Sequence, residues 1–209
     1  MKNPLDYQRA QRHLGRRDPV LKRLIRKVGP CTLRVNGDHF VVLIKSIVSQ
    51  QLSITAAATI HARLVASLAG EALTPASLLL LSEDALVSAG LSRAKRVALR
   101  DLATKVHSQE VILNDAQSLS DEDLIERLVR VKGIGRWTAE MFLIFSLGRL
   151  DVLPVADLGL RAAVQQEYAL KELPDKNQIE ELGEPWRPFR SIATWYMWRS
   201  RGFLPELKK

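Results

Sequence analysis

The sequence predicts an all-α protein, on three observations. Apolar residues recur at helical spacing through most of the 209-residue chain. Ser, Thr or Asp precedes many of these stretches and glycine follows several of them, which is typical of helix N-caps and C-terminal stops. The one strand-like stretch, TLRVNGDHFVV, contains Asn36-Gly37, and we expect a loop or at most a small hairpin there.

The first expected helix follows Asp18, with Pro19 at its first position and Gly29 at its end. Its apolar residues recur at helical spacing and form one stripe. Further helices are expected, in chain order, in HFVVLIKSIVSQ, SITAAATIHARLVASLAG, TPASLLLLS and SEDALVSAG, the last three capped by Ser53, Thr74 and Ser82.

The second half of the chain gives similar signals. A helix is expected from Ser92 through SRAKRVALRDLATKV, followed by the pair SDEDLIERLVRV and TAEMFLIFSLG. The last helices are expected in LGLRAAVQQEYAL, DKNQIEELG and PFRSIATWYMWRS. No stretch is long and polar enough to be a linker, so any lobes must pack against each other.

The composition is that of a basic globular protein. Hydrophobic residues make up 46% of the chain, which excludes a largely disordered protein. Lys and Arg outnumber Asp and Glu by 31 to 23, and this excess favours a polyanionic partner. Charge alone does not choose between DNA, RNA and an anionic membrane surface. The single cysteine, Cys31, excludes an internal disulfide and any cluster held by several cysteines.

Two further features bear on location. No apolar run approaches the roughly 20 residues that span a bilayer. The N-terminal segment, MKNPLDYQRAQRHLGRRDP, is charged and lacks the apolar core of a signal peptide. With one cysteine, the chain fits a reducing compartment.

The stretch VKGIGRWTAEMF, residues 131–142, predicts a tight hairpin between two helices. Gly133 and Gly135 suit such a hairpin, because glycine reaches backbone conformations closed to residues with a Cβ. The next helix begins with unpaired backbone N–H groups that can bind an anion, and Lys132 and Arg136 add cations beside them. A bare structural corner is the alternative. The flanking helices favour a helix–hairpin–helix element, which holds a DNA strand without reading its sequence.

The stretch LDVLPVADLGLR places Asp157 where a new helix should begin, after the stop at Pro154. Asp157 could be only an N-cap, or it could be a catalytic carboxylate whose direction the capping amides fix. The neighbouring carboxylate, Asp151, is expected to be structural.

Three other groups of residues are candidates for DNA contact. In SIVSQQLSITAAATI, two glutamines between helices are either solvated or able to fill the gap left by an extruded base. Trp137 and Trp198 could wall a pocket that stacks an electron-poor ring, whereas core packing is expected of Trp186 and Trp195. The start of SRAKRVALRDLA is either a solvated helix face or a phosphate contact through Ser92, Arg93 and Lys95.

These pieces stand in an order that resembles the 3-methyladenine DNA glycosylase II family of the helix–hairpin–helix glycosylase superfamily. The matching segments span residues 40–200 and are IVSQQLSITAAATI, GLSRAKRVALRDLA, LVRVKGIGRWTAEMFLIFSLG, DVLPVADLGLR and WRPFRSIATWYMW. The resemblance implies a short form without the N-terminal β-rich domain of longer bacterial members. It also implies removal of alkylated bases such as 3-methyladenine and 7-methylguanine from duplex DNA.

Carried over by position, Asp157 matches the catalytic aspartate of the family, although Ala156 replaces its usual acidic neighbour. Gln51 matches the residue that wedges into the duplex, and Trp137 and Trp198 match aromatic residues of the base pocket. Met141 stands where some relatives carry a tyrosine, so the resemblance fixes neither the pocket shape nor the base preference.

Two absences separate this chain from other branches of the superfamily. Members that also cut the strand carry a lysine two residues beyond the second hairpin glycine, where this chain has Trp137. Without that amine no Schiff base with the sugar can form. Members with an iron–sulfur cluster need four cysteines. The resemblance therefore implies a monofunctional enzyme without cluster or other cofactor.

The expected architecture is a single helix–hairpin–helix glycosylase unit with two packed helical lobes and an active-site cleft between them. Lobe one is expected at roughly 1–45 plus 150–209, and lobe two at roughly 46–149 with the hairpin at 131–137. The expected partner is duplex DNA containing alkylated bases, bound by a monomer in the cytoplasm (the bacterial nucleoid) or in a eukaryotic nucleus. No membrane partner is expected. No metal site is certain, although the hairpin carbonyls could hold a cation against a phosphate.

Other functions remain open. A non-catalytic helix–hairpin–helix module would bind DNA and leave methylated bases in place. A bifunctional glycosylase and lyase acting on oxidised bases would need the missing lysine. A helical scaffold that binds RNA through its basic charge is a weaker alternative.

Overall fold

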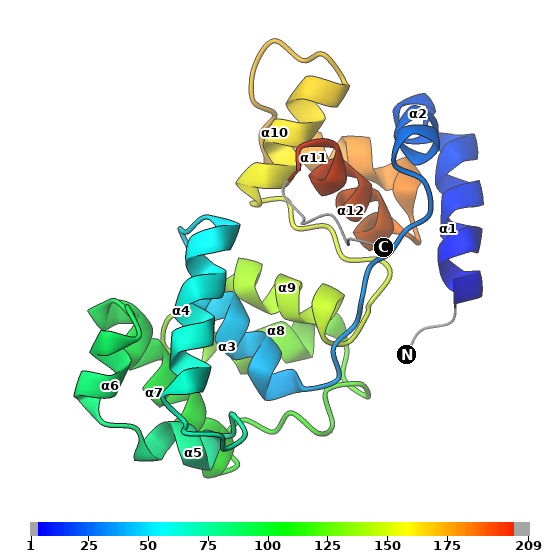
Figure 1. Cartoon of the computed structure of the whole chain (residues 1–209). Coiled ribbons are helices and arrows are strands. Elements are labelled where there is room, and N and C mark those ends of the chain that lie inside the picture. Colours follow the sequence, from blue (N-terminus) through cyan, green and yellow to red (C-terminus); the bar gives the residue numbers. More distant parts are fainter. Residues whose placement is uncertain (1–3, 203–209) are drawn as a thin grey trace. The chain divides into compact units, whose positions relative to one another are not determined.

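The computed structural model describes residues 4–202, which form twelve α-helices, one short 3-10 helix and no strand (Figure 1). The predicted all-α fold is confirmed. In chain order the helices are α1 (Pro4–Arg17), α2 (Pro19–Val28), α3 (His39–Ser49), α4 (Ile54–Ala66), α5 (Pro75–Leu80), α6 (Glu83–Ser88), α7 (Arg93–His107), α8 (Asp121–Val129), α9 (Arg136–Phe145), α10 (Leu158–Glu167), α11 (Lys176–Gly183), η1 (Glu184–Trp186) and α12 (Arg190–Ser200).

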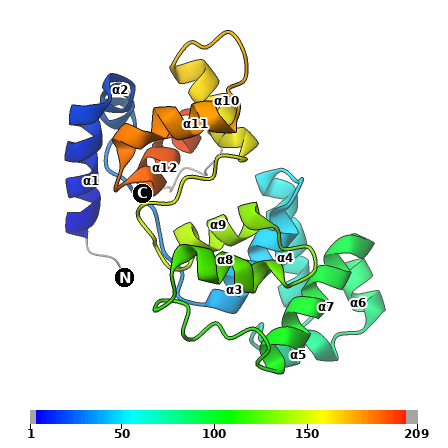
Figure 2. The same cartoon turned by 180° about the vertical axis from the view of Figure 1, so that it is seen from behind.

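The chain divides into two compact units. The first unit combines the described residues up to Val35 with those from Gly148 onward, and the second is Asn36–Leu147. The predicted boundary near residue 45 therefore differs from the observed one. α3 belongs to the second unit because it packs against α4, α7 and α9 (Figures 1 and 2). The cleft expected between the lobes stays a prediction.

The first unit is built around α12, which packs against α2 and α10. Every residue of α12 from Ser191 to Trp198 is buried, so this helix is the core of the unit rather than one of its faces. A buried carboxylate, Asp18, joins further elements, because it caps α2 and accepts hydrogen bonds from the indole N–H of Trp186 and the hydroxyl of Tyr168.

The second unit is a continuous stretch of chain whose two ends are tied together. The backbone N–H of Asn36 donates to the carbonyl of Phe145 at 2.9 Å. At the first residue of α3, Nδ1 of His39 lies 2.8 Å from Oγ of Ser146, which in turn donates to the carbonyl of Asn36 at 3.2 Å. Entry into the unit and exit from it are therefore adjacent, as in an inserted domain.

The helix caps follow the sequence closely. Asp18, Ser53, Thr74, Ser82 and Ser92 each accept a backbone N–H from the first turn of the helix that follows, as predicted. The Asn36-Gly37 pair lies in a loop between α2 and α3 rather than in a hairpin.

One α-helix was not predicted. α1 is strongly polar, and among its residues with described side chains only Ala10 and Leu14 are buried apolar residues. An i, i+4 pair is too short a stripe to predict a helix. None of the helices in residues 4–202 has both the length and the apolar character needed to span a bilayer.

Candidate active site

Asp157 is the N-cap of α10, and two N–H groups hold its carboxylate. The backbone N–H of Leu160 donates to Oδ1 at 2.5 Å, and the indole Nε1–H of Trp198 donates to the same oxygen at 2.9 Å. The residue is only 9% exposed. An N-cap role and a catalytic role for Asp157 are therefore compatible. The cap itself fixes the direction of a carboxylate that could stabilise a positive charge or orient a water.

The turn before Asp157 is held by close packing within the first unit. The N–H of Asp157 donates to the carbonyl of Pro154 at 2.9 Å, and the N–H of Val152 donates to Oγ of Ser191 on α12 at 2.9 Å. A Cβ added at Gly183 would lie 2.6 Å from a methyl carbon of Leu153, so glycine there lets α11 approach this segment. The turn is thus braced from two helices.

Asp151 is structural, as expected. Its carboxylate accepts Nε of Arg190 at 2.7 Å and a guanidinium N–H of Arg187 at 3.0 Å. Arg190 also donates to the backbone carbonyl of Asp151 at 2.7 Å. These ion pairs join the start of the Asp157 segment to the start of α12.

The predicted hairpin is present between α8 and α9 in the second unit, but its two glycines differ. Gly133 has φ of +78°, and a Cβ there would lie 2.7 Å from the Cβ of Ala98 on α7. Gly135 has φ of −96° and no atom within 4 Å of an added Cβ. Both glycines were expected to suit the hairpin through the backbone freedom of glycine. Gly133 uses it, whereas Gly135 does not, and the surroundings of Gly135 are open.

The start of α9 is suited to an anion. Gly135 supplies no side-chain cap, whereas Ser120 caps α8 and Ser92 caps α7. Backbone N–H groups at such a helix start point outward and carry the positive end of the helix dipole.

The two neighbouring glutamines between α3 and α4 have different roles. Gln51 is exposed and has φ of +57°, so it stands at the tip of a tight turn. Gln50 is half-buried, and its Nε2 donates to the carbonyl of Gly133 at 2.9 Å and to Oγ1 of Thr138 at 3.0 Å. The sequence singled out Gln51 as a DNA contact and did not distinguish Gln50.

Comparison with known families decides the assignment of this arrangement. The family described as HhH-GPD superfamily base excision DNA repair protein matches residues 44–188. The chain belongs to this superfamily.

Individual members of the HhH-GPD superfamily match almost the whole chain. The alkylbase DNA glycosidase-like protein mag2 of Schizosaccharomyces pombe is 33% identical over 100% of this chain and 99% of its own length. DNA-3-methyladenine glycosylase 1 of the same yeast is 36% identical over 92% of this chain and 86% of its own. The structure of the S. pombe 3-methyladenine DNA glycosylase Mag1 in complex with abasic DNA matches with a TM-score of 0.84 at 36% identity, covering 96% of this chain and 100% of that one. The predicted family resemblance is confirmed.

Within this HhH-GPD chain, Lys95 does not face solvent as a free cation. Its Nζ donates to the carbonyls of Val48 at 2.8 Å and Gln50 at 2.9 Å, at the end of α3. Burial lowers the pKa of Lys95. Lys95 thus closes a helix end, while Ser92 caps α7 and Arg93 is exposed beside it. The predicted contact of these three residues with DNA stays a prediction.

Of the two hairpin cations, Arg136 is engaged through its side chain, and Lys132 is held through its backbone. The guanidinium of Arg136 donates two hydrogen bonds to Glu122, at 2.9 and 2.5 Å, and one to Glu140 at 3.2 Å. The backbone N–H of Lys132 donates to Asp101 of α7 at 2.8 Å, which fixes the hairpin on that helix. A phosphate would have to compete with Glu122 for Arg136.

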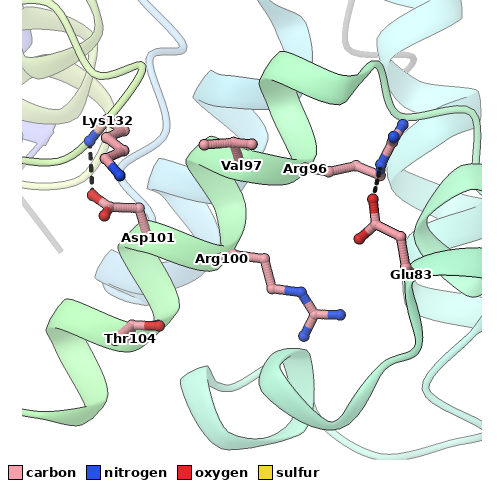
Figure 3. Close-up of a pocket in the computed structure, with 7 residues that line it drawn as sticks. All are labelled: Glu83, Arg96, Val97, Arg100, Asp101, Thr104 and Lys132. Carbon is pink, nitrogen blue, oxygen red and sulfur yellow. Dashed lines mark hydrogen bonds and ion pairs between the residues drawn. The ribbon is translucent and has the colours of Figure 1, made fainter.

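Lys132 lines a pocket of about 330 Å³ on the exposed side of α7 (Figure 3). Arg96 and Arg100 also line it, and their guanidinium groups are largely used inside the protein. Arg96 pairs with Glu83 at 2.5 Å and donates to the carbonyl of Leu91 at 2.7 Å. Arg100 donates to carbonyls at the end of α5. The two arginines of the pocket therefore connect α7 to α5 and α6, and Lys132 of the hairpin completes the lining.

The predicted base-pocket residues lie on two units. Trp137 and Met141 are one turn apart on α9, so they share a face of that helix in the second unit. Trp198 belongs to α12 of the first unit and contacts Asp157 directly. Residues 4–202 contain no group of three His, Cys, Asp or Glu side chains that could hold a metal ion.

Proposed function

We propose that this protein is a monofunctional DNA N-glycosylase that excises alkylated purines, of the 3-methyladenine and 7-methylguanine type, from duplex DNA. The observation that carries the proposal is Asp157, a buried carboxylate held by Leu160 and Trp198 in a chain of the HhH-GPD superfamily. Two relatives above 30% identity carry alkylbase or 3-methyladenine glycosylase names, and a matching structure was solved with abasic DNA, which is what base removal leaves behind.

Excision of an alkylated purine depends on a negatively charged carboxylate rather than on a proton donor. An alkylated purine is already cationic and leaves the sugar without protonation, so the barrier lies in the positive, oxocarbenium-like sugar and in the delivery of water. A carboxylate of fixed direction stabilises that charge and orients or deprotonates the water. Asp157 takes this part because its two N–H donors pin it. Neutral purines are discriminated against by their poor leaving-group ability.

The strand is held by the other unit. The start of α9, beside Gly135, binds a backbone phosphate through its N–H groups, and Gln51 enters the base stack where the flipped nucleotide has left. Trp137 at position two beyond the second glycine leaves no lysine for a Schiff base at this point, so strand cleavage is not part of the reaction.

The decisive experiment compares Asp157→Asn with the wild type on methylated duplex DNA, with the freed bases identified by chromatography. Asparagine keeps an oxygen for the Leu160 and Trp198 N–H groups, so the fold and the affinity for abasic DNA should persist. Base release should fall by about 10² to 10³, the effect of losing one electrostatic stabiliser. Asp175→Asn is a matched control, because Asp175 caps α11 in the same unit through the same kind of bond.

Three results would change the proposal. Equal base release by Asp157→Asn would remove this carboxylate from the mechanism. A wild-type protein that binds DNA but frees no base would favour the non-catalytic helix–hairpin–helix module. A covalent adduct trapped by borohydride on DNA with oxidised bases would favour the bifunctional enzyme.

A further inference from the structure

Gln50 is the point at which three elements of the second unit meet. Its side-chain amide bonds the hairpin, through the carbonyl of Gly133 at 2.9 Å, and the first turn of α9, through Oγ1 of Thr138 at 3.0 Å. Its backbone carbonyl accepts Nζ of Lys95 on α7 at 2.9 Å. Both the side chain and the main chain of this residue are therefore fixed.

The residue that follows has the opposite character. Gln51 is exposed, with a left-handed backbone at φ +57°, and α4 does not begin until Ile54. Gln51 projects from a short turn whose preceding residue is locked to the hairpin. The bond to Thr138 is partly buried, since Thr138 is only 2% exposed, whereas the bond to Gly133 lies at the surface.

We propose that Gln50 is a positioning residue that sets the spacing between the hairpin and the base-replacing side chain of Gln51. The inference rests on the proposed function and deepens it. The hairpin holds the strand and Gln51 enters the base stack. Both contacts can form at once only when the distance between the hairpin and the Gln51 side chain matches the geometry of the DNA. A link through Gln50 makes the loop and the hairpin one rigid part.

Rigidity matters here because base flipping consumes much of the binding energy. Unstacking and unpairing a nucleotide cost a few kcal/mol. A loop that must first become ordered would spend part of its interaction energy on that ordering. Gln50 removes this cost before DNA arrives, through contacts that need no DNA. Its removal should therefore impair insertion much more than it impairs strand binding.

The test is a double-mutant cycle with Gln50→Leu and Gln51→Ala. Leucine keeps most of the side-chain volume and removes both amide hydrogen bonds. The readouts are single-turnover base release from methylated duplex DNA and the fluorescence of 2-aminopurine placed beside the lesion, which rises when the base leaves the stack. Affinity for abasic duplex is measured in parallel as the readout of strand grip.

We expect Gln50→Leu to lower base release by about tenfold and to reduce the fluorescence gain, with at most about a threefold loss in affinity for abasic DNA. In the Gln51→Ala background the same change should have almost no further effect, because the residue it positions is already gone. Thr138→Val, a nearly isosteric change that removes one of the two contacts, should give a smaller loss of the same kind. It also covers the case in which Gln50→Leu unfolds.

Two control variants match the perturbations. Gln117→Leu removes another side-chain amide bond to a carbonyl in the same unit, that of Leu147 at 3.3 Å, away from the loop. Gln109→Ala makes the same change as Gln51→Ala at another left-handed backbone position, with φ of +61°. Both controls should release bases at the wild-type rate.

Additive losses in the cycle, or equal losses in insertion and in affinity, would overturn the proposal and leave Gln50 as a general stabiliser. So would a wild-type protein that leaves 2-aminopurine fluorescence unchanged. Failure of the proposed function looks different. In that case no base is released by any variant, while the fluorescence gain still depends on Gln50 through Gln51.

Discussion

The indole N–H of Trp198 donates to Oδ1 of Asp157 at 2.9 Å, although the two residues are 41 positions apart in the chain. The bond joins α12, the buried core helix of the first unit, to the first residue before α10. The direction of the proposed catalytic carboxylate is thus set by the most buried helix of its unit. Trp198 acts through Asp157 and is in that sense a positioning residue.

Trp198→Phe should therefore impair catalysis without emptying the site. Phenylalanine keeps an aromatic ring and loses the N–H donor, so of the Leu160 and Trp198 N–H groups only that of Leu160 still donates to Asp157. We expect base release to fall by about tenfold and the free energy of unfolding to fall by about 1–2 kcal/mol. Single-turnover kinetics and denaturant unfolding measure the two effects. Trp195→Phe, on the same helix, is the control, and an equal loss in both variants would contradict the prediction.

The two hairpin glycines should respond oppositely to alanine. Gly133→Ala puts a Cβ at φ +78° and 2.7 Å from Ala98, so we expect a loss of about 2–4 kcal/mol in the free energy of unfolding. Gly135→Ala introduces neither strain nor a clash, and stability should change by less than about 0.5 kcal/mol.

Gly135→Ala should affect DNA affinity even though it leaves stability almost unchanged. A strand lying against the open surface at Gly135 would meet the new methyl group, so Gly135→Ala should weaken binding of abasic duplex by about tenfold, or about 1.4 kcal/mol. Fluorescence anisotropy with labelled duplex measures this. Unchanged affinity in a stable Gly135→Ala protein would place the strand elsewhere.

Glu122 should restrain DNA binding by holding Arg136. The two hydrogen bonds from Arg136 lower the pKa of Glu122, so the pair is ionised at neutral pH. Glu122→Gln should release the guanidinium, raise the affinity for duplex about threefold and steepen the salt dependence by about 0.9 in the log–log slope, the value for one added phosphate contact. Glu126→Gln removes the same charge one turn along α8. Equal gains in both variants would show a general charge effect instead.

The pH dependence of stability should carry the signature of His39. Burial, opposed by the charge of Asp38, lowers the pKa of His39 below its ordinary value of 6.5. The unfolded chain then binds the proton more readily than the folded chain, so stability is complete above pH 6.5 and falls as the pH drops toward the folded-state pKa. His61 shifts in the same direction, through burial and the charge of Lys45.

Urea unfolding between about pH 7 and pH 5 would show this decline. His39→Gln should flatten it, since it removes one of the two shifted groups and leaves an acceptor or donor near Ser146. His107→Gln, at an exposed position at the end of α7, should leave the slope unchanged. A slope that is the same in all three proteins would assign the dependence to other groups.

The helices could be predicted wherever an apolar stripe and a cap agree. α2 has Asp18, Pro19 and Gly29 in their expected places, and its stripe buries Leu21 and Leu24. α1 could not be predicted because very few of its residues are apolar, and these do not form a recognisable helical stripe. The start of the second unit at Asn36 could not be predicted from the sequence either. α3 is apolar on most sides, so its composition does not say which neighbours it packs against.

The candidate site shows a similar division. Asp157 could be singled out as a helix cap because a proline stop and an expected helix start bracket it, whereas its catalytic role was implied only by the family resemblance. What could not be read is how adjacent residues of one type divide their roles. Gln50 turns inward and Gln51 outward because the backbone changes hand between them. Lys95 has the charge expected of a phosphate-binding residue, but its Nζ donates instead to backbone carbonyls at the end of α3.

The adjacent ends of the second unit have a consequence for biosynthesis. Everything from Asn36 to Leu147 is synthesised before residue 148, so the bond from Asn36 to Phe145 can close that unit as soon as the segment has emerged from the ribosome. The first unit must wait, because α2 requires α12 as a packing partner. During translation the part that grips nucleic acid is thus finished early, and the aspartate that would cut the glycosidic bond receives its tryptophan partner among the last described residues to appear.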